Sequence, residues 1–498
     1  MSKNFDLQLF LAEAIERKNG VSLFQQIYEG LRQAILFRRL RVGMRLPPTR
    51  HLAQELKVSR NTVMGAFEQL IAEGYLTGKQ GSGTFVAEEL PDDLLQARAE
   101  SLKVRPQKNS VRKIAKRGKS LSYAAFSFST ESNKPRAFQT GLSAIDEFPL
   151  EIWARIVAKR LRKMPRTFLD YGDSLGFLPL REAIAEYLTV SRGARCEASQ
   201  IIIVAGSQQG LDLAARVLLD KGDEVWIEDP NYPGAHGALL GAGAKLAPVP
   251  IDGEGINVKA GKQRAKKACA VYVTPSHQFP LGVVMSLSRR LELLEWANQS
   301  SAWIIEDDYD SEFRYNGKPL AALQGLDNHN RVIYLGTFSK VLFPSLRLGY
   351  LVVPPDLVEP FGKAQAITMY QTALLEQVVL TDFINAGYFG RHVRRMRALY
   401  GERQAALIQA IRKDLHDFLD VEEDSAGMHL VAWLKGNLNA VEIAEMALQN
   451  GVYVSPISFY CIKAKLREGI LLGYTGINPT EIRRGAKRLQ MILQSLSK

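Results

Sequence analysis

The spacing of apolar positions changes along the chain and separates three sections. In residues 20–88 apolar side chains recur every three to four positions, as in amphipathic helices, and a Gly-rich segment follows. Residues 89–135 carry little periodic apolar pattern. From residue 136 onward, short apolar runs alternate with amphipathic stretches, which is typical of an α/β domain with a mainly parallel sheet. The clearest runs are Ile201–Ala205, Glu224–Ile227, Ala270–Thr274, Trp303–Glu306, Val332–Leu335 and Gly349–Val353. We therefore expect an N-terminal domain over 1–88, a linker over 89–135 and a large domain over 136–498.

The first section predicts three helices and a two-stranded hairpin. A helix over Val21–Phe37 places five apolar side chains on one face. After Pro47 and Pro48, Thr49 is the expected N-cap of a second helix, which runs to about residue 56. Ser59 is the expected N-cap of a third helix. The segment GYLTGKQGSGTFV then alternates and turns through glycines, which predicts a wing.

Two short helices joined by a tight turn, the second opening in Ser-Arg-Asn-Thr, suit a reader of the DNA major groove. A helix N-terminus attracts phosphate, and Arg and Asn make bidentate contacts to guanine and adenine edges. The alternative for this section is a three-helix module that binds protein. LPPTRHLAQELKVSRNTV followed by GSGTFV resembles the winged helix-turn-helix of the GntR family of repressors. That resemblance implies binding to double-stranded operator DNA, and it implies contacts from Arg50, Ser59, Arg60, Asn61, Thr62 and Gly81.

The net charge of +12 is unevenly distributed. Residues 97–136 hold eleven Lys or Arg against two Glu. Such a basic segment is either a solvated linker or a linker that also contacts DNA phosphates.

In the third section, Lys340 follows a buried β-type run in VIYLGTFSKVLFPSLRLGYLVV. A desolvated lysine has a lowered pKa and can form a Schiff base. Thr337, Ser339 and Arg347 supply hydroxyls and a cation that suit a phosphate. These residues predict a site for pyridoxal 5'-phosphate (PLP).

Other segments supply the remaining parts of such a site. A carboxylate has to pair with the pyridinium nitrogen, and Asp307 is the better candidate, with Asp308 the second. Tyr309 is placed to reach the phenolic oxygen of the cofactor. Ser207 and Gln208 lie where a helix N-terminus is expected to hold phosphate. Tyr232 either stacks on the ring or packs in the core, and His277 either borders the cofactor or has a structural hydrogen-bonding role, while Gln278 follows it along the same segment.

Six motifs in order resemble a fold-type I aminotransferase, and with the winged helix they resemble the MocR subfamily of GntR regulators. The motifs are YGDSLGFLPLREAIAEYL, GSQQGLDLAARVLLDKGDEV, EDPNYPGAH, TPSHQFPLG, IEDDYDSEF and GTFSKVLFPSLRLGY. The resemblance implies a large domain with a mainly parallel central sheet and a C-terminal α+β subdomain. It implies PLP attached to Lys340 and a head-to-tail homodimer, in which Tyr171 reaches the partner's cofactor phosphate.

Two positions depart from the aminotransferase pattern. Phe279 stands where aminotransferases often carry Asn, which leaves Tyr309 to hold the phenolic oxygen alone. In GILLGYTG, Leu471 occupies the place of the Arg that binds the ligand carboxylate. Burying an unpaired carboxylate against Leu is costly, and Arg467 is the nearest cation in sequence that could compensate.

We therefore expect a PLP-dependent transcription regulator whose large domain senses a small amine, an amino acid or a B6 vitamer, and which is not an enzyme. The departure at Leu471 favours a B6 vitamer or an amine without an α-carboxylate. The alternatives are an active aminotransferase with an accessory DNA-binding domain, and a partner-binding protein with an inactive PLP fold. No apolar run reaches the ~18 residues of a membrane span, and the three cysteines have no metal or redox spacing. Asp6, Glu13 and Glu16 within the apolar N-terminal stretch argue against a signal peptide. These features favour a cytoplasmic protein.

Overall fold

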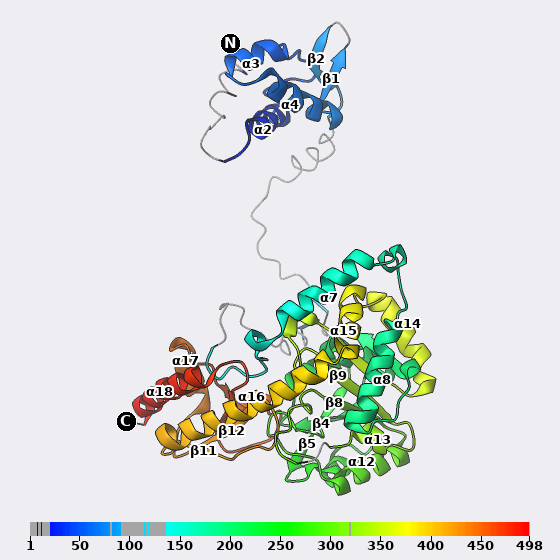
Figure 1. The fold of residues 1–498 in the computed structure, drawn as a ribbon, viewed down its shortest axis with the longest axis vertical. Coiled ribbons are helices and arrows are strands. Elements are labelled where there is room, and N and C mark those ends of the chain that lie inside the picture. Colours follow the sequence, from blue (N-terminus) through cyan, green and yellow to red (C-terminus); the bar gives the residue numbers. More distant parts are fainter. Residues whose placement is uncertain are drawn as a thin grey trace. The chain divides into compact units, whose positions relative to one another are not determined.

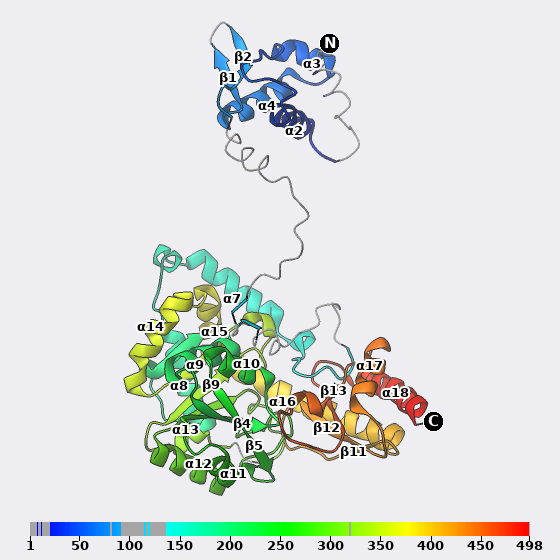
Figure 2. The same cartoon turned by 180° about the vertical axis from the view of Figure 1, so that it is seen from behind.

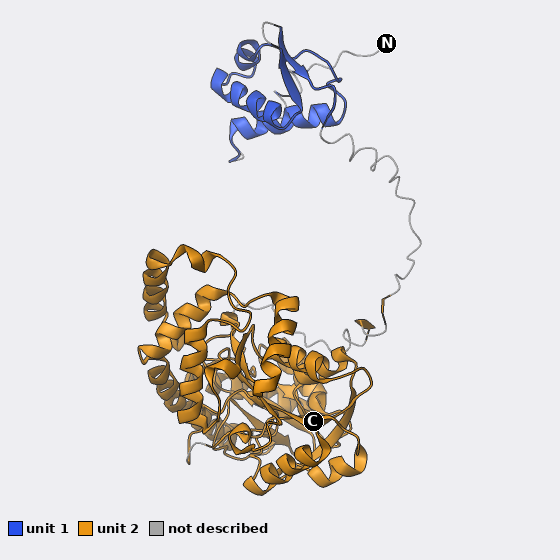
Figure 3. Ribbon diagram, turned by 90° about the vertical axis from the view of Figure 1, so that its right-hand side faces the viewer, with its two compact units in different colours: residues 1–113 blue, residues 114–498 orange. Residues whose placement is uncertain are grey.

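The computed structural model describes residues 7, 11, 20–79, 82–90, 114–115, 118–119, 136–317 and 320–497. The chain divides into two compact units, residues 1–113 and 114–498 (Figure 3). The predicted linker over 89–135 falls almost wholly outside the described residues, so its boundaries stay a prediction. Among the described residues, no helix is both long enough and apolar enough to cross a membrane.

The N-terminal unit has the predicted helices and wing. Its elements are α2 (Leu23–Leu36), α3 (Thr49–Glu55), α4 (Arg60–Ala72), β1 (Leu76–Lys79) and β2 (Gly83–Val86). β1 and β2 pair antiparallel, from Leu76 opposite Val86 to Lys79 opposite Gly83. Buried side chains of all three helices, among them Ile27, Leu52 and Phe67, form one core. This core extends to Leu90, two residues beyond the predicted end of the domain.

One helix boundary differs from the prediction. Thr49 is the first residue of α3 rather than its N-cap, and Pro48 holds the cap position without a side-chain hydrogen bond. Proline's fixed φ suits the start of a helix, and its missing N–H is not needed there. Ser59 does cap α4, since its Oγ accepts a hydrogen bond from the Thr62 backbone N–H at 3.1 Å.

The larger unit is built on an eight-stranded sheet in the order β3-β10-β9-β8-β7-β4-β5-β6 (Figure 1). Strands β4, β5, β7, β8 and β9 are mutually parallel, while β10 runs antiparallel to both of its neighbours and β6 forms a short antiparallel pair with β5. All six predicted runs are strands. The strand bounds are β3 (Ile201–Val204), β4 (Glu224–Asp229), β5 (Lys245–Asp252), β6 (Gly255–Ile256), β7 (Ala270–Val273), β8 (Trp303–Asp308), β9 (Val332–Thr337) and β10 (Gly349–Val352).

Helices cover both faces of this sheet because its central strands are apolar on both sides. On one face, Ile202, Ile305 and Leu335 pack with α9 (Ser207–Leu218), α10 (Pro233–Ala242) and α14 (Val358–Met369). On the other face the covering helices are α8 (Leu178–Arg192), α11 (Val258–Arg264), α12 (Leu287–Ser300) and α13 (Leu323–Leu326). Consecutive residues of one strand therefore point into different cores, which decides the roles of the two aspartates in β8.

A smaller antiparallel sheet near the C-terminus forms the predicted α+β subdomain (Figure 2). Its order is β11-β12-β14-β13, with β11 (Leu419–Val421), β12 (His429–Leu434), β13 (Ser455–Pro456) and β14 (Gly469–Gly473). The remaining helices are α7 (Leu150–Lys163), α15 (Leu374–Asn385), α16 (Tyr388–Ala410), α17 (Ala440–Gln449) and α18 (Pro479–Leu496).

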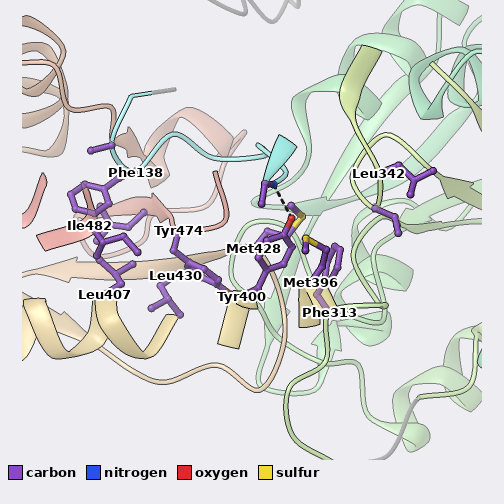
Figure 4. Packing of buried hydrophobic residues seen from close by; sticks show 14 of the residues in the cluster. Phe138, Phe313, Leu342, Met396, Tyr400, Leu407, Met428, Leu430, Tyr474 and Ile482 are labelled. Atoms are coloured by element: carbon purple, nitrogen blue, oxygen red, sulfur yellow. Dashed lines mark hydrogen bonds between the residues drawn. The ribbon is translucent and has the colours of Figure 1, made fainter. Parts of the chain in front are cut away.

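One continuous core joins the subdomain to the large sheet (Figure 4). Tyr400 of α16 lies in this core, and its hydroxyl accepts a hydrogen bond from the Ala144 backbone N–H at 2.9 Å. Phe313 packs edge-to-face against the Tyr400 ring. Because the two sheets share a core, residues of β12 are held at fixed positions beside the ends of β7 and β8.

Candidate PLP site and DNA-binding helix

A cavity opens at the carboxyl ends of β7, β8 and β9. In α/β sheets this edge is where ligands bind. The cavity is lined by Gly141, Ser207, Tyr232, Tyr272, Thr274, Phe279, Asp307, Tyr309, Thr337, Lys340, Met428 and His429. The sequence thus predicted the two residues of greatest chemical consequence, Lys340 and Asp307, at a common site.

Lys340 presents a primary amine to this cavity. Its Nζ donates a hydrogen bond to the Gly141 backbone carbonyl at 2.8 Å. Burial lowers the pKa of Lys340, and Asp310 and Asp307 offset part of that shift. A buried amine with a lowered pKa is more often unprotonated, which is the form that attacks a carbonyl carbon.

Asp307 has one carboxylate oxygen committed and one free. The Tyr272 hydroxyl donates to Oδ2 at 2.8 Å, while Oδ1 is buried with no hydrogen-bond partner among the described residues. Burial raises the pKa of Asp307 to about 7. The unpaired Oδ1 is suited to accept a hydrogen bond from a cationic ring nitrogen of a bound molecule, since no described residue donates to it. Sequence reasoning missed Tyr272, although its hydroxyl in the otherwise apolar run of β7 was a signal.

Asp308 faces the opposite side of the sheet and is excluded as the partner of a ring nitrogen. The guanidinium of Arg192 donates to its Oδ2 at 2.8 Å, and the Tyr334 hydroxyl donates to the same oxygen. Arg192 also bonds Ser276 Oγ and the Leu320 carbonyl. Asp308 is therefore part of a buried structural ion pair.

The other end of the cavity is suited to a phosphate. α9 begins at Ser207, as predicted, and its N-cap Gly206 has φ of 88°. A Cβ atom at Gly206 would lie 3.3–3.4 Å from the Arg347 guanidinium, so this cation lies directly beside the start of α9. Ser339 Oγ is buried without a partner among the described residues. The N-terminus of α9, the Arg347 cation and the unpaired Ser339 hydroxyl are donors of the kind that a phosphate requires. Of the predicted phosphate-binding residues, Ser207 and Thr337 line the cavity, whereas Ser339 and Arg347 do not.

The remaining predicted residues lie at different distances from the cavity. Tyr232 lines it and packs edge-to-face against Phe279. Gln208 does not line it, since its amide donates to the Gly234 carbonyl at 2.9 Å. Tyr171 is 75% exposed and contacts the ring of Tyr370, so it does not line this chain's cavity.

His277 lies behind the wall of the cavity. Its Nδ1 is 2.9 Å from Asp310 and 3.1 Å from the Tyr309 hydroxyl, and its Nε2 is 3.0 Å from Asp424. Burial alone would lower the pKa of His277, but the two carboxylates raise it to about 10. His277 therefore contacts Tyr309, which lines the cavity, and ties it to the C-terminal subdomain through Asp424.

The position of the missing arginine is fully apolar. Leu471 is buried with Ile457 and Tyr460, and Phe279 packs against this group. Arg467 points elsewhere, since its guanidinium bonds the Leu434 carbonyl and Asp420. Arg467 therefore does not replace the absent carboxylate-binding cation.

On the N-terminal unit, α4 presents the predicted reading side chains. Arg60 and Asn61 are exposed in its first turn, directly after the Ser59 cap, and Arg50 is exposed on α3. Thr62 is half-buried and its hydroxyl lies 2.8 Å from Ser59 Oγ. Gly81 lies outside the described residues.

Comparisons with known proteins agree with both halves of this arrangement. Residues 144–489 match the family of aminotransferases of class I and II, and residues 23–86 match the gntR family of bacterial regulatory proteins. The structure of the Pyrococcus horikoshii kynurenine aminotransferase, solved with PMP, superposes with a TM-score of 0.68 at 29% identity, over 81% of this chain and all of that one. The aminotransferase family indicates dependence on PLP. The chain is therefore a DNA-binding transcription regulator with an aminotransferase-like domain.

Relatives define the group more narrowly. The probable rhizopine catabolism regulatory protein MocR of Rhizobium meliloti is 41% identical over 97% of this chain and 96% of its own length. The pyridoxine biosynthesis regulator PdxR of Corynebacterium glutamicum is 31% identical over 93% of this chain and 94% of its own length. This chain belongs to the MocR-type subfamily of GntR regulators.

Proposed function

We propose that this regulator holds PLP on Lys340 and uses it to sense a small amine rather than to catalyse transamination. The proposal rests on one observation. The same cavity is lined by Lys340, with its buried amine, and by Asp307, whose buried Oδ1 has no hydrogen-bond partner among the described residues. A bound PLP supplies an aldehyde that condenses with primary amines. The ligand that the cavity admits is then the effector.

The chain's own residues fit the cofactor at each end. Asp307 is placed to pair with the ring nitrogen, and Tyr309 with the phenolic oxygen. Tyr232 would cover one ring face. Ser207, Thr337, Ser339 and Arg347 would hold the phosphate, and His277 would fix the hydroxyl of Tyr309.

The effector we propose is an amine without an α-carboxylate, or a B6 vitamer. The apolar group around Leu471 offers no cation to a carboxylate, and leaving that charge buried and unpaired would cost several kcal/mol. The same feature disfavours steady transamination of α-amino acids.

We further propose a head-to-tail homodimer. No residue of α7 is buried within the single chain, and the side chains of Leu150 and Leu161 in this helix are more than half exposed. The exposed Tyr171 is placed to reach a neighbouring subunit rather than its own cavity. Apolar surface of this kind is commonly covered in oligomers.

The experiment uses the full chain and DNA selected by it from a random library. Affinity for the selected duplex is measured with and without PLP, and then with a primary amine added to the PLP-loaded protein. We expect the amine to change DNA affinity ~5-fold or more, the usual size of coupling between two sites. Unchanged affinity together with sustained formation of a keto acid from an amino donor would favour the aminotransferase alternative.

A second measurement concerns the reading helix. Replacing Arg60 with alanine is expected to weaken binding to the selected duplex by ~1–3 kcal/mol and to relax preference at one base position. Glu68→Ala, an exposed change later on α4, is the matched control and should leave base preference intact. An Arg60 variant that keeps the wild-type ratio of affinities for selected and scrambled duplexes would remove Arg60 from base readout.

A further inference from the structure

His429 forms part of the cavity wall contributed by the C-terminal subdomain. It is the first residue of β12, is 4% exposed, and lines the cavity beside Met428. Its Nε2 lies 2.9 Å from the Pro280 backbone carbonyl. A carbonyl only accepts hydrogen bonds, so Nε2 carries the hydrogen. In a neutral ring Nδ1 is then an acceptor, and no described residue donates to it.

Burial and a charged neighbour together keep His429 neutral. His277 faces a carboxylate at each ring nitrogen, which favours its charged form, and the two rings are 5.8 Å apart. Burial and the charge of His277 together lower the pKa of His429 to about 4. At neutral pH the ring therefore offers an unpaired lone pair rather than a second cation.

The surroundings of this acceptor are otherwise apolar. Phe279 packs against His429 with ring centroids 5.4 Å apart, and the buried Leu471 lies behind Phe279. Among the described residues that line the cavity, Lys340 is the one lysine or arginine, and the proposed function assigns its amine to the cofactor. A ligand beside His429 thus meets the apolar side chains of Phe279 and Met428 and the acceptor of His429 itself.

We propose that His429 selects the effector: Nδ1 accepts a hydrogen bond from a hydroxyl group, so the effector is a hydroxylated primary amine without a carboxylate. This inference rests on the proposed function, because it assumes that the amine joins PLP at Lys340. A buried acceptor that loses its partner is left unsatisfied, so a ligand of the same size lacking the hydroxyl binds less well.

The test uses matched ligand pairs on the PLP-loaded full-length protein. The pairs are 3-aminopropan-1-ol with butylamine, and trans-2-aminocyclohexanol with trans-2-methylcyclohexylamine. Binding is followed as the shift of the visible absorbance band, which reports ligation and not turnover. We expect each amino alcohol to bind ~10-fold more tightly than its partner, and L-alanine and L-serine to bind more weakly than either amino alcohol.

Two variants separate recognition from structure. His429→Gln places its amide near the position of Nε2, so it keeps a donor to the Pro280 carbonyl and loses the acceptor in the cavity. His429→Asn places its amide near Nδ1, so it keeps the acceptor and loses the bond to Pro280. We expect the preference for amino alcohols to disappear in the Gln variant and to persist in the Asn variant.

Three outcomes would overturn the inference in a protein that does bind PLP. These are no preference within the ligand pairs, tighter binding of the α-amino acids, and a preference that survives His429→Gln. A wild-type protein that stays colourless with PLP is a different result, because it overturns the proposed function and this inference with it.

Discussion

Lys340→Ala is expected to abolish the yellow absorbance that the wild-type protein acquires on incubation with PLP. The visible band depends on a covalent bond between the aldehyde and an amine, and Lys340 Nζ is the amine in the cavity, 2.8 Å from the Gly141 carbonyl. Alanine removes that amine and leaves the phosphate-binding end intact. The variant should therefore hold PLP only non-covalently, and filtration should remove the cofactor together with its colour.

The matched control is Lys363→Ala, which removes an exposed lysine of α14 whose partner is Glu359. It should leave the band unchanged. Circular dichroism of both variants shows whether either has lost its fold. A Lys340→Ala protein that keeps a band after filtration would place the covalent bond on another amine and would remove Lys340 from the proposed site.

That Lys340 lies in the cavity could be predicted from the sequence because its context is local. The apolar run before Thr337, the lysine three residues on and Arg347 beyond it lie within one short stretch. The six strands of the large sheet were predictable for the same reason, since each is a contiguous apolar run. The Ser59 cap of α4 is equally local, because it depends on four consecutive residues.

Features that depend on distant segments were not predictable in the same way. The bond between His277 and Asp424 joins residues 147 positions apart, and it decides that His277 supports Tyr309 from behind. His429 reaches the cavity only because β12 shares a core with the large sheet. The reversed direction of β10 leaves no trace in its composition, because β10 is as apolar as the parallel strands of the same sheet.

The roles of the two aspartates of β8, Asp307 and Asp308, could be predicted only in part. Alternation along a strand puts consecutive side chains on opposite faces, so only one of Asp307 and Asp308 can face the cavity. The sequence favoured Asp307 but did not exclude Asp308. The choice depends on residues of other elements, because Tyr272 bonds Asp307 on the face of the cavity and Arg192 bonds Asp308 on the opposite face. Because Asp307 and Asp308 have different surroundings, substituting each of them should change the stability of the folded protein by different amounts.

Breaking the buried pair of Asp308 and Arg192 is expected to destabilise the larger unit by ~3–5 kcal/mol, because removal of one partner leaves a charge buried without compensation. Both side chains are at most 5% exposed. Arg192→Ala and Asp308→Asn should each lower the urea concentration at the midpoint of unfolding, followed by tryptophan fluorescence and circular dichroism in the absence of PLP.

Asp307→Asn is the matched control, since it changes the adjacent carboxylate in the same strand. Burial already raises the pKa of Asp307 to about 7, and its Oδ1 has no partner among the described residues, so removing its charge also removes an unfavourable burial. We expect a change of less than ~1 kcal/mol in the cofactor-free protein. The same variant should weaken retention of PLP, whereas Asp308→Asn should affect retention only as far as it affects folding. If Asp307→Asn destabilised the cofactor-free protein as much as Asp308→Asn does, the division of the two carboxylates between a ligand site and a structural ion pair would be wrong.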